Sequence, residues 1–333
     1  NDTKQQTKIH ISGGLKHQFF TNFESNIHLH LNKSLVIDTK AEDNPLFYGK
    51  ILASGNVDLK GPFNDLKIIS KELRTEKGSA IYIPLNSEET IATKDYIKFV
   101  NNDINTELSK RTNTIKKRIE ENVNLSGLLL DFNLFISPET YFEIIFDEQA
   151  GEKIKVYGGG NLQVVVDTRG DFKMSGIYEI KKGTYNFTLA NFINKQFNIA
   201  PNSKIVWNGS PYEGTLDIQA RYEQNASLAP LINDTTFLQN NPDARRAVKT
   251  AVLLNLKGSL LSPEIKFGID VPTYPRYLEV EQAIQNLFST INFNEQELNK
   301  QVFSLIVLKQ FSALNEFNLN LGSSSASTVS ELL

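Results

Sequence analysis

The feature that most constrains this chain is a two-residue alternation of apolar and polar side chains. Residues 183–189, 215–222 and 263–271 each carry an apolar side chain at every second position. Successive side chains of a β-strand point to opposite faces, so this alternation is typical of a sheet with one dry and one wet face. The sequence therefore predicts a mostly β protein.

The same alternation occurs near the start of the chain. In residues 47–59, the apolar side chains of Ile51, Ala53, Val57 and Leu59 fall on one face. Polar and charged side chains occupy the opposite face, and a Gly-Pro pair ends the segment. We therefore expect the strand-rich body to begin well before the middle of the chain.

Composition limits the classes of function. The chain has 333 residues, of which 40% are hydrophobic and 22% charged, as in a folded protein. The formal net charge of -3, without a basic block, argues against nucleic acid as a partner. The absence of cysteine excludes disulfides and thiolate metal sites, and it suits a cytoplasm or a bacterial periplasm equally well. No apolar run approaches the about 18 residues of a membrane-spanning helix.

Changes of pattern divide the chain into five segments. One stretch is polar, highly charged and poor in apolar side chains, which predicts a mobile or helical insertion. After Pro272 the apolar period changes from that of a strand to that of a helix. The predicted segments are an upstream β-rich segment, 1–100; the charged insertion, 101–124; the main β-rich domain, 125–272; a helical segment, 273–317; and a tail, 318–333.

Two amphipathic helices are predicted in the helical segment. In the first, Val280, Ala283, Ile284, Leu287 and Phe288 recur at helical spacing. Before the second, Asn294 is the expected N-cap and Glu297 its capping-box partner. The apolar residues of this second helix are Leu298, Val302, Leu305 and Leu308.

The residues that most resemble a chemical site have simpler explanations. His28 and His30 share one face of a predicted strand and could hold a metal, but an exposed polar face accounts for them better. Glycines 158–160 lack the Lys and the helix of a phosphate-binding loop, so they predict a bend or a close approach of strands. Neither a Ser-His-Asp motif nor Gly-x-Ser-x-Gly is present. We therefore predict no catalytic residue, no metal ligand, no cofactor and no enzyme activity.

Several longer stretches resemble a known family. The segments that carry the likeness are rich in glycine and alternating apolar residues, and the last of them is a helical stretch followed by Phe311: 158–162, 170–187, 197–211, 216–220 and 297–305. They resemble the C-terminal domain of TamB-like proteins, which belong with the AsmA-like proteins. The likeness covers residues 125–333, and residues 48–68 are similar to the sequence just upstream of that domain. The charged insertion departs from the family pattern.

The resemblance implies a fold and a cellular role. TamB-like proteins form a long, folded-over β-sheet, a β-taco, whose open groove is apolar. They are anchored in the inner membrane of diderm bacteria, cross the periplasm and are implied to carry phospholipid between the two membranes. Their partner is an outer-membrane β-barrel assembly protein, TamA or a relative. We expect this sequence to be a piece of a longer protein, with the membrane anchor outside it.

An apolar groove would make lipid transfer feasible. Exposure of acyl chains to water costs about 0.8 kcal/mol per methylene group, on the order of 20 kcal/mol for two chains. The sequence carries no nucleotide-binding motif, so directionality must come from elsewhere. The residues predicted to line the groove for phospholipid acyl chains are Ile51, Ala53, Val57, Leu59, Leu216, Ile218, Ala220, Val252, Leu254, Leu256, Ile265, Phe267 and Ile269.

Other interpretations stay open at this point. From periodicity alone, the apolar faces are explained by an ordinary core between two sheets. A scaffold or chaperone for outer-membrane barrel assembly, without lipid conduction, is the alternative function. In either case the region after Phe311 is expected to dock to the barrel partner by strand addition.

Overall fold

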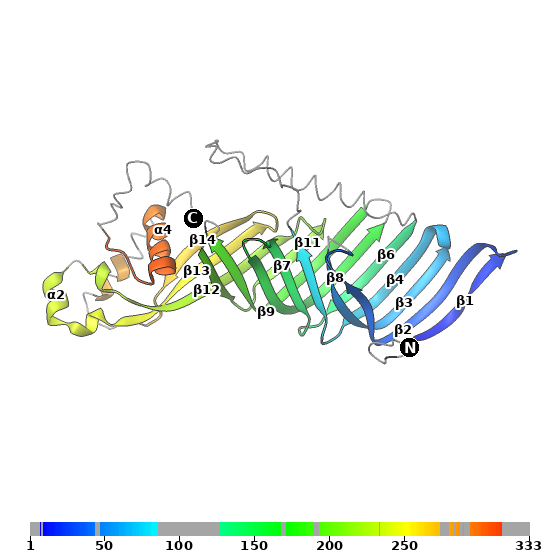
Figure 1. The fold of residues 1–333 in the computed structure, drawn as a ribbon, viewed down its shortest axis with the longest axis horizontal. Helices are drawn as coiled ribbons and strands as arrows, with labels where there is room; N and C mark the ends of the chain where they lie inside the picture. Colours follow the sequence, from blue (N-terminus) through cyan, green and yellow to red (C-terminus); the bar gives the residue numbers. More distant parts are fainter. Residues whose placement is uncertain are drawn as a thin grey trace, which may run out of the picture.

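The computed structural model describes residues 7, 9–43, 47–85, 127–167, 171–189, 193–232, 234–273, 280–282, 284–286, 289 and 294–314. Within these ranges the protein is mostly β, as predicted, and elongated (Figure 1). The strands are β1 (His10–Gln18), β2 (Thr21–Thr39), β3 (Tyr48–Pro62), β4 (Leu66–Thr75), β5 (Ala80–Pro84), β6 (Leu128–Ile136), β7 (Tyr141–Asp147), β8 (Glu152–Asp167), β9 (Asp171–Leu189), β10 (Ile193–Ile199), β11 (Lys204–Gly209), β12 (Thr215–Ser227), β13 (Ala247–Ser259) and β14 (Pro263–Asp270).

Helical elements are short. The described 3₁₀-helices are η1 (Phe63–Asp65), η2 (Ala229–Leu231) and η3 (Pro242–Arg245), and α2 (Thr235–Asn240) begins at an Asp234 N-cap. The longest of the described helices is α4 (Glu295–Phe303), which continues into the π-helix η4 (Ser304–Leu308). The predicted insertion, 101–124, and the tail, 318–333, lie outside the described residues.

The fourteen described strands form one sheet, in which eleven follow the order β1-β2-β3-β4-β6-β8-β9-β10-β12-β13-β14 and β5, β7 and β11 pair beside this path. Figure 1 shows these strands side by side along the long axis, from β1 at one end to β14 near α4. All described pairings are antiparallel except β4 with β6 and β5 with β7. Parallel neighbours differ from antiparallel ones in that a short hairpin cannot connect them.

Neighbouring strands break at aligned positions, and hydroxyl groups replace the lost backbone hydrogen bonds. The break between β4 and β5 lies beside the break between β6 and β7, where the hydroxyls of Thr75 and Thr140 are 2.7 Å apart. The Ser137 N–H donates to Thr75 Oγ1 at 2.9 Å. The Ser79 hydroxyl accepts from the Leu52 N–H at 3.0 Å and donates to the Leu52 carbonyl at 3.1 Å. These bonds satisfy backbone groups at the strand breaks.

The prediction of an open groove is wrong in one respect. The pairings of β3, β4, β6, β8, β7 and β5 return to their starting strand, so six strands close a circuit with the connectivity of a barrel. The circuit closes because β4 and β5 lie end to end along one edge of β3, while β6 and β7 lie end to end along one edge of β8. The folded sheet was predicted, but its closure was not.

The helical segment covers one end of the sheet. The Asn294 side chain accepts from the N–H groups of Gln296 and Glu297, which confirms the predicted N-cap. The buried residues of this segment include Val302, Leu305 and Ile306. Of the first predicted helix, residues 280–282 and 284–286 are helical, and Val280 and Ile284 are buried as expected.

The prediction that Leu308 lies on the apolar face of the second helix is wrong. The Leu308 side chain is 53% exposed, whereas Ile306 is fully buried. The last turn is a π-helix, whose wider turn rotates later side chains away from the 3.6-residue pattern used in the prediction.

Candidate functional site

The inner face of the sheet carries two apolar clusters. The larger one extends from β5 to β14 and into the helical segment. The smaller one lies on β2, β3 and β4, where Leu31, Ala53, Val57 and Leu73 are buried. We call the smaller cluster, with the neighbouring apolar residues of the same strands and of β1, the N-terminal apolar face: Ile11, Leu15, Leu29, Leu31, Ala53, Val57, Leu59, Ile68 and Leu73.

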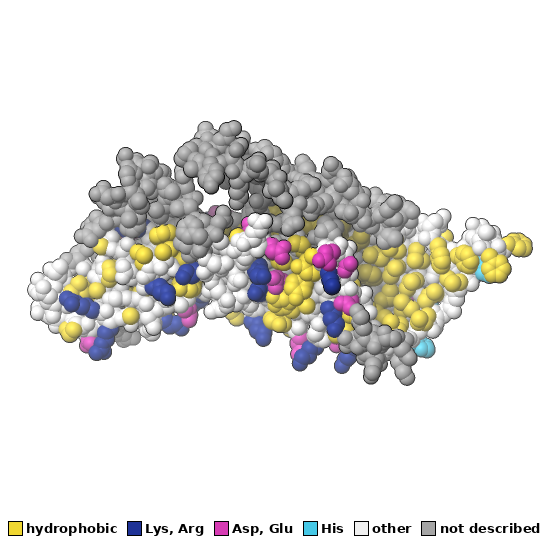
Figure 2. Space-filling model, viewed as in Figure 1, with side chains coloured by type: hydrophobic (Ala, Val, Ile, Leu, Met, Phe, Trp, Pro, Cys, Tyr) yellow, Lys and Arg dark blue, Asp and Glu magenta, His cyan; other side chains and the backbone are white. Residues whose placement is uncertain are grey.

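The N-terminal apolar face is accessible toward β1. Ile11 lies opposite Leu29, and the Ile11 side chain is 63% exposed. Leu15, which lies opposite Ser25 further along β1, is 49% exposed. Figure 2 shows hydrophobic side chains spread over the face of β1 to β4 that is turned to the viewer. An apolar surface of this extent, contiguous over several strands, is the kind of surface that binds a partner or a ligand.

The predicted lining residues divide between the two clusters. Ala53, Val57 and Leu59 belong to the N-terminal apolar face, and Ile51 on the same strand is partly buried. The remaining nine meet in the larger cluster, where adjacent strands pair Ile218 with Leu256 and Leu254 with Phe267. Among these nine, the buried side chains are those of Leu216, Ile218, Ala220, Val252, Leu254, Leu256 and Ile269, and the partly buried ones are those of Ile265 and Phe267.

The two clusters therefore differ in what covers them. Leu254 and Ile218 have no exposed surface at all, because side chains of other strands pack on them. They form an ordinary core in this structure. The accessible part of the inner face lies at the β1 end.

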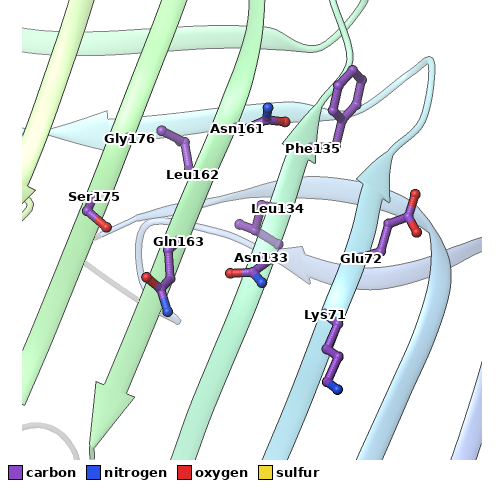
Figure 3. Close-up of a pocket in the computed structure, with 10 residues that line it drawn as sticks. All are labelled: Lys71, Glu72, Asn133, Leu134, Phe135, Asn161, Leu162, Gln163, Ser175 and Gly176. Carbon is purple, nitrogen blue, oxygen red and sulfur yellow. The ribbon is translucent and has the colours of Figure 1, made fainter.

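A depression of about 440 Å³ lies over β4, β6, β8 and β9 (Figure 3). Leu134 and Leu162 are directly opposite each other in its lining, and Gly176 faces Leu162 from β9. Leu134 also packs against both apolar clusters, so the depression lies where the accessible face meets the closed core. A Cβ atom at Gly176 would come 2.1 Å from the Asn161 carbonyl oxygen, so this position must stay without a side chain.

Sequence reasoning missed the contribution of β1 and β2. The alternation of residues 26–31 gave a usable signal for Leu29 and Leu31, but these residues were not among the predicted lining. Ile11 and Leu15 were harder to find, because two glycines separate them in a short strand.

The opposite face of the first strands is charged and polar. Asp58 accepts from Lys60 Nζ at 2.8 Å, and its carboxylate lies 2.6 Å from His28 Nδ1. The hydrogen bonds from Lys60 and His28 hold the pKa of Asp58 below its usual value. His30 Nδ1 lies 2.8 Å from the Asn56 side-chain oxygen. Both histidines therefore belong to an exposed, hydrogen-bonded polar face, the simpler of the two interpretations above.

Two tyrosines place hydroxyl groups in the larger cluster. The Tyr185 hydroxyl donates to Glu152 Oε1, and burial raises the pKa of Glu152 although this hydrogen bond lowers it. Burial also raises the pKa of Tyr178. The Tyr178 hydroxyl is buried and has no hydrogen-bond partner among the described residues. Such a group costs stability unless a water or a ligand meets it.

No group of three His, Asp or Glu side chains within the described ranges is arranged as a metal site would require. Among the same residues, no helix combines the length and the apolar character needed to cross a membrane.

An elongated, folded sheet with an apolar inner face and a charged outer face defines an extended amphipathic β-sheet protein. Residues 1–333 match the family model described as TamB C-terminal domain. The chain therefore belongs to the TamB family, and the resemblance seen in the sequence is confirmed. A comparison with curated proteins found no match.

Membership in the family carries a general role. TamB proteins are envelope-associated transport and assembly components, and they are not a known enzyme family. The domain implies a role in the translocation and assembly module, in outer-membrane biogenesis, together with outer-membrane partners.

Proposed function

We propose that this chain shields the acyl chains of phospholipids on the N-terminal apolar face while they pass between the two membranes. The observation that carries the proposal is the accessibility of that face at Ile11 and Leu15, beside a cluster that is otherwise packed. Acyl chains are its best ligand because they are apolar along their whole length and need no specific polar partner. The charged headgroup would stay in water, since its burial without a partner is costly.

The closed core limits where the lipid binds. Protein side chains cover six of the predicted lining residues: Leu216, Ile218, Ala220, Val252, Leu254 and Leu256. The acyl chains would therefore lie on β1–β4 and in the depression beside Leu134. Each methylene group that moves from water to this surface is stabilised by about 0.8 kcal/mol. About ten methylene groups shielded in this way would contribute on the order of 8 kcal/mol, which corresponds to micromolar binding.

Two adjacent residues of β4 provide a matched test. Ile68 packs against the N-terminal apolar face, and Ile69 lies on the other side of the same strand, opposite Asp58. Both are partly buried, so asparagine at either position removes a comparable side chain. We expect Ile68→Asn to lose bound phospholipid in native mass spectrometry, and Ile69→Asn to keep it.

Two outcomes would contradict the proposed lipid binding. A wild-type chain that carries no lipid after purification and exposure to phospholipid vesicles would overturn the proposal. So would equal lipid occupancy in the two asparagine variants, provided that circular dichroism shows both to be folded.

The edges of the sheet favour a second role, in barrel assembly. Among the described strands, β1 pairs only with β2, and β14 pairs only with β13. Edge strands expose backbone donors and acceptors that another strand can use. We propose that the chain works in the periplasm, anchored in the inner membrane by a segment outside this sequence, and that its C-terminal region docks to a TamA-like barrel by strand addition.

Residues 318–333 lie outside the described structure, so deletion tests the docking directly. We expect a chain without them to recover less of the barrel partner on copurification. Unchanged recovery would overturn the docking proposal. Crosslinks to unfolded barrel proteins without any lipid binding would favour the scaffold function over the lipid conduit.

A further inference from the structure

The turn between β1 and β2 exposes two adjacent phenylalanines. Gln18 pairs with Thr21, so Phe19 and Phe20 alone form the two-residue loop of the hairpin. Phe19 is 97% exposed and Phe20 is 80% exposed. We call these two residues the aromatic tip. Within the described residues, the His17 ring stacks on Phe20 with ring centroids 4.8 Å apart, and both phenylalanines stay largely exposed.

The backbone of the aromatic tip is unfavourable for phenylalanine. The φ angles are 49° at Phe19 and 62° at Phe20, both in the left-handed region. Two positive φ values define the type I′ turn, for which asparagine followed by glycine is the favoured sequence. A residue with a bulky side chain adopts this region only at a cost in stability. The chain thus places two large apolar side chains in water at positions where small residues would be more stable.

The surroundings of the tip suit the interface of a lipid bilayer. Figure 1 shows β1 and β2 at one extreme of the long axis, with the hairpin projecting past the neighbouring strands. The residues on both sides of the tip are polar: His17 and Gln18 on β1, Thr21 and Asn22 on β2. An apolar end with a polar collar matches the change from acyl chains to headgroups across the interface.

The tip is also continuous with the N-terminal apolar face. Leu15 lies on β1 between the tip and Ile11, on the inner face of the sheet. On the next strand Phe23 stacks on Phe63, with ring centroids 5.8 Å apart, and Phe63 belongs to the turn after β3. Apolar side chains therefore connect the tip with the N-terminal apolar face, the proposed surface for acyl chains.

We propose that the aromatic tip inserts into the interface of a phospholipid bilayer, where it brings the N-terminal apolar face into contact with the acyl chains. This inference rests on the proposed lipid-shielding function for its purpose, but its test does not. The tip contacts the membrane, whereas Ile68 contacts a lipid that has already left it. The proposed membrane insertion and the proposed lipid shielding can therefore fail separately.

The decisive variant is Phe19→Asn combined with Phe20→Gly. It supplies the favoured type I′ sequence, so the melting temperature should stay the same or rise. In flotation with vesicles of phosphatidylethanolamine and phosphatidylglycerol, we expect its binding to fall by about tenfold or more. Ile177→Ser is the matched control, because Ile177 is 47% exposed on β9, far along the sheet from the tip, and its loss should leave vesicle binding unchanged.

A second variant reports the insertion itself. In Phe19→Trp the new indole should shift its emission to the blue when vesicles are added. The native Trp207 is 2% exposed and should not respond. Equal vesicle binding by the wild type and the Asn-Gly variant, or no shift from the new indole, would overturn the proposal. Self-association of the wild type without vesicle binding, lost in the Asn-Gly variant, would likewise overturn it and assign the tip to a contact between copies.

Discussion

Replacement of Tyr185 by phenylalanine should destabilise the protein by an amount that depends on pH. The Tyr185 side chain is 1% exposed, and its hydroxyl donates to Glu152 at the start of the neighbouring strand β8. Hydrogen bonds to charged groups contribute about 1.5–3 kcal/mol, whereas bonds between neutral groups contribute about 1 kcal/mol. We therefore expect a loss of about 2 kcal/mol at a pH above the folded-state pKa of Glu152.

The direction of the pH dependence follows from the pKa of Glu152. Burial raises this pKa above its ordinary value of 4.5, so the folded state holds the proton more tightly than the unfolded state. Stability then falls as pH rises from the unfolded pKa through the folded pKa. Loss of the Tyr185 hydroxyl removes a contribution that lowers the pKa, so in Tyr185→Phe the fall should be larger and should extend to higher pH.

Urea denaturation, followed by circular dichroism at about pH 4 and about pH 7.5, measures the effect. The difference in unfolding free energy between wild type and Tyr185→Phe should be about 1 kcal/mol or less at the lower pH. Glu152→Gln should abolish the pH dependence of that difference. An equal loss at both pH values would refute the account, because it would show that the Glu152 charge does not contribute.

Three further substitutions test other parts of the fold. Tyr178→Phe should change the unfolding free energy by less than about 0.5 kcal/mol, or raise it, since the hydroxyl has no partner among the described residues; a larger loss would reveal one. Leu254→Ala should cost about 2–5 kcal/mol in urea denaturation, because the side chain is fully buried in the larger cluster; a loss below that range would show a loosely packed core. Asn294→Ala should cost about 1 kcal/mol, and hydrogen exchange should place the loss in α4; unchanged protection there would contradict the N-cap assignment.

Local features were predictable because they depend on neighbours in the sequence. The Asn294 cap needs only the N–H groups two and three residues later, and the structure confirms it. The glycines at 158–160 were predicted to mark a close approach, and a Cβ atom at Gly158 would lie 2.2 Å from the Glu179 carbonyl oxygen. The capping box itself is not seen, since Glu297 pairs with Lys300 and Gln301 instead.

The closure of six strands was beyond sequence reasoning. It depends on the strand breaks at residues 76–79 and 137–140, which lie beside each other only because β4 pairs in parallel with β6. A Ser or Thr that replaces a backbone hydrogen bond across strands looks like any other polar residue in a turn. Its hydrogen-bond partner, and therefore its structural role, is set by strands that are distant in the sequence.

The sequence by itself determined that this protein is a chain of amphipathic strands with one apolar face, because alternation is a local property of an extended backbone. Only the tertiary structure decided which part of that face stays accessible. Ile218 and Ile11 carry the same side chain at the same kind of alternating position, yet the first is fully buried and the second is 63% exposed. The difference lies in the strands that pack over Ile218 and leave Ile11 uncovered, and no local pattern records it.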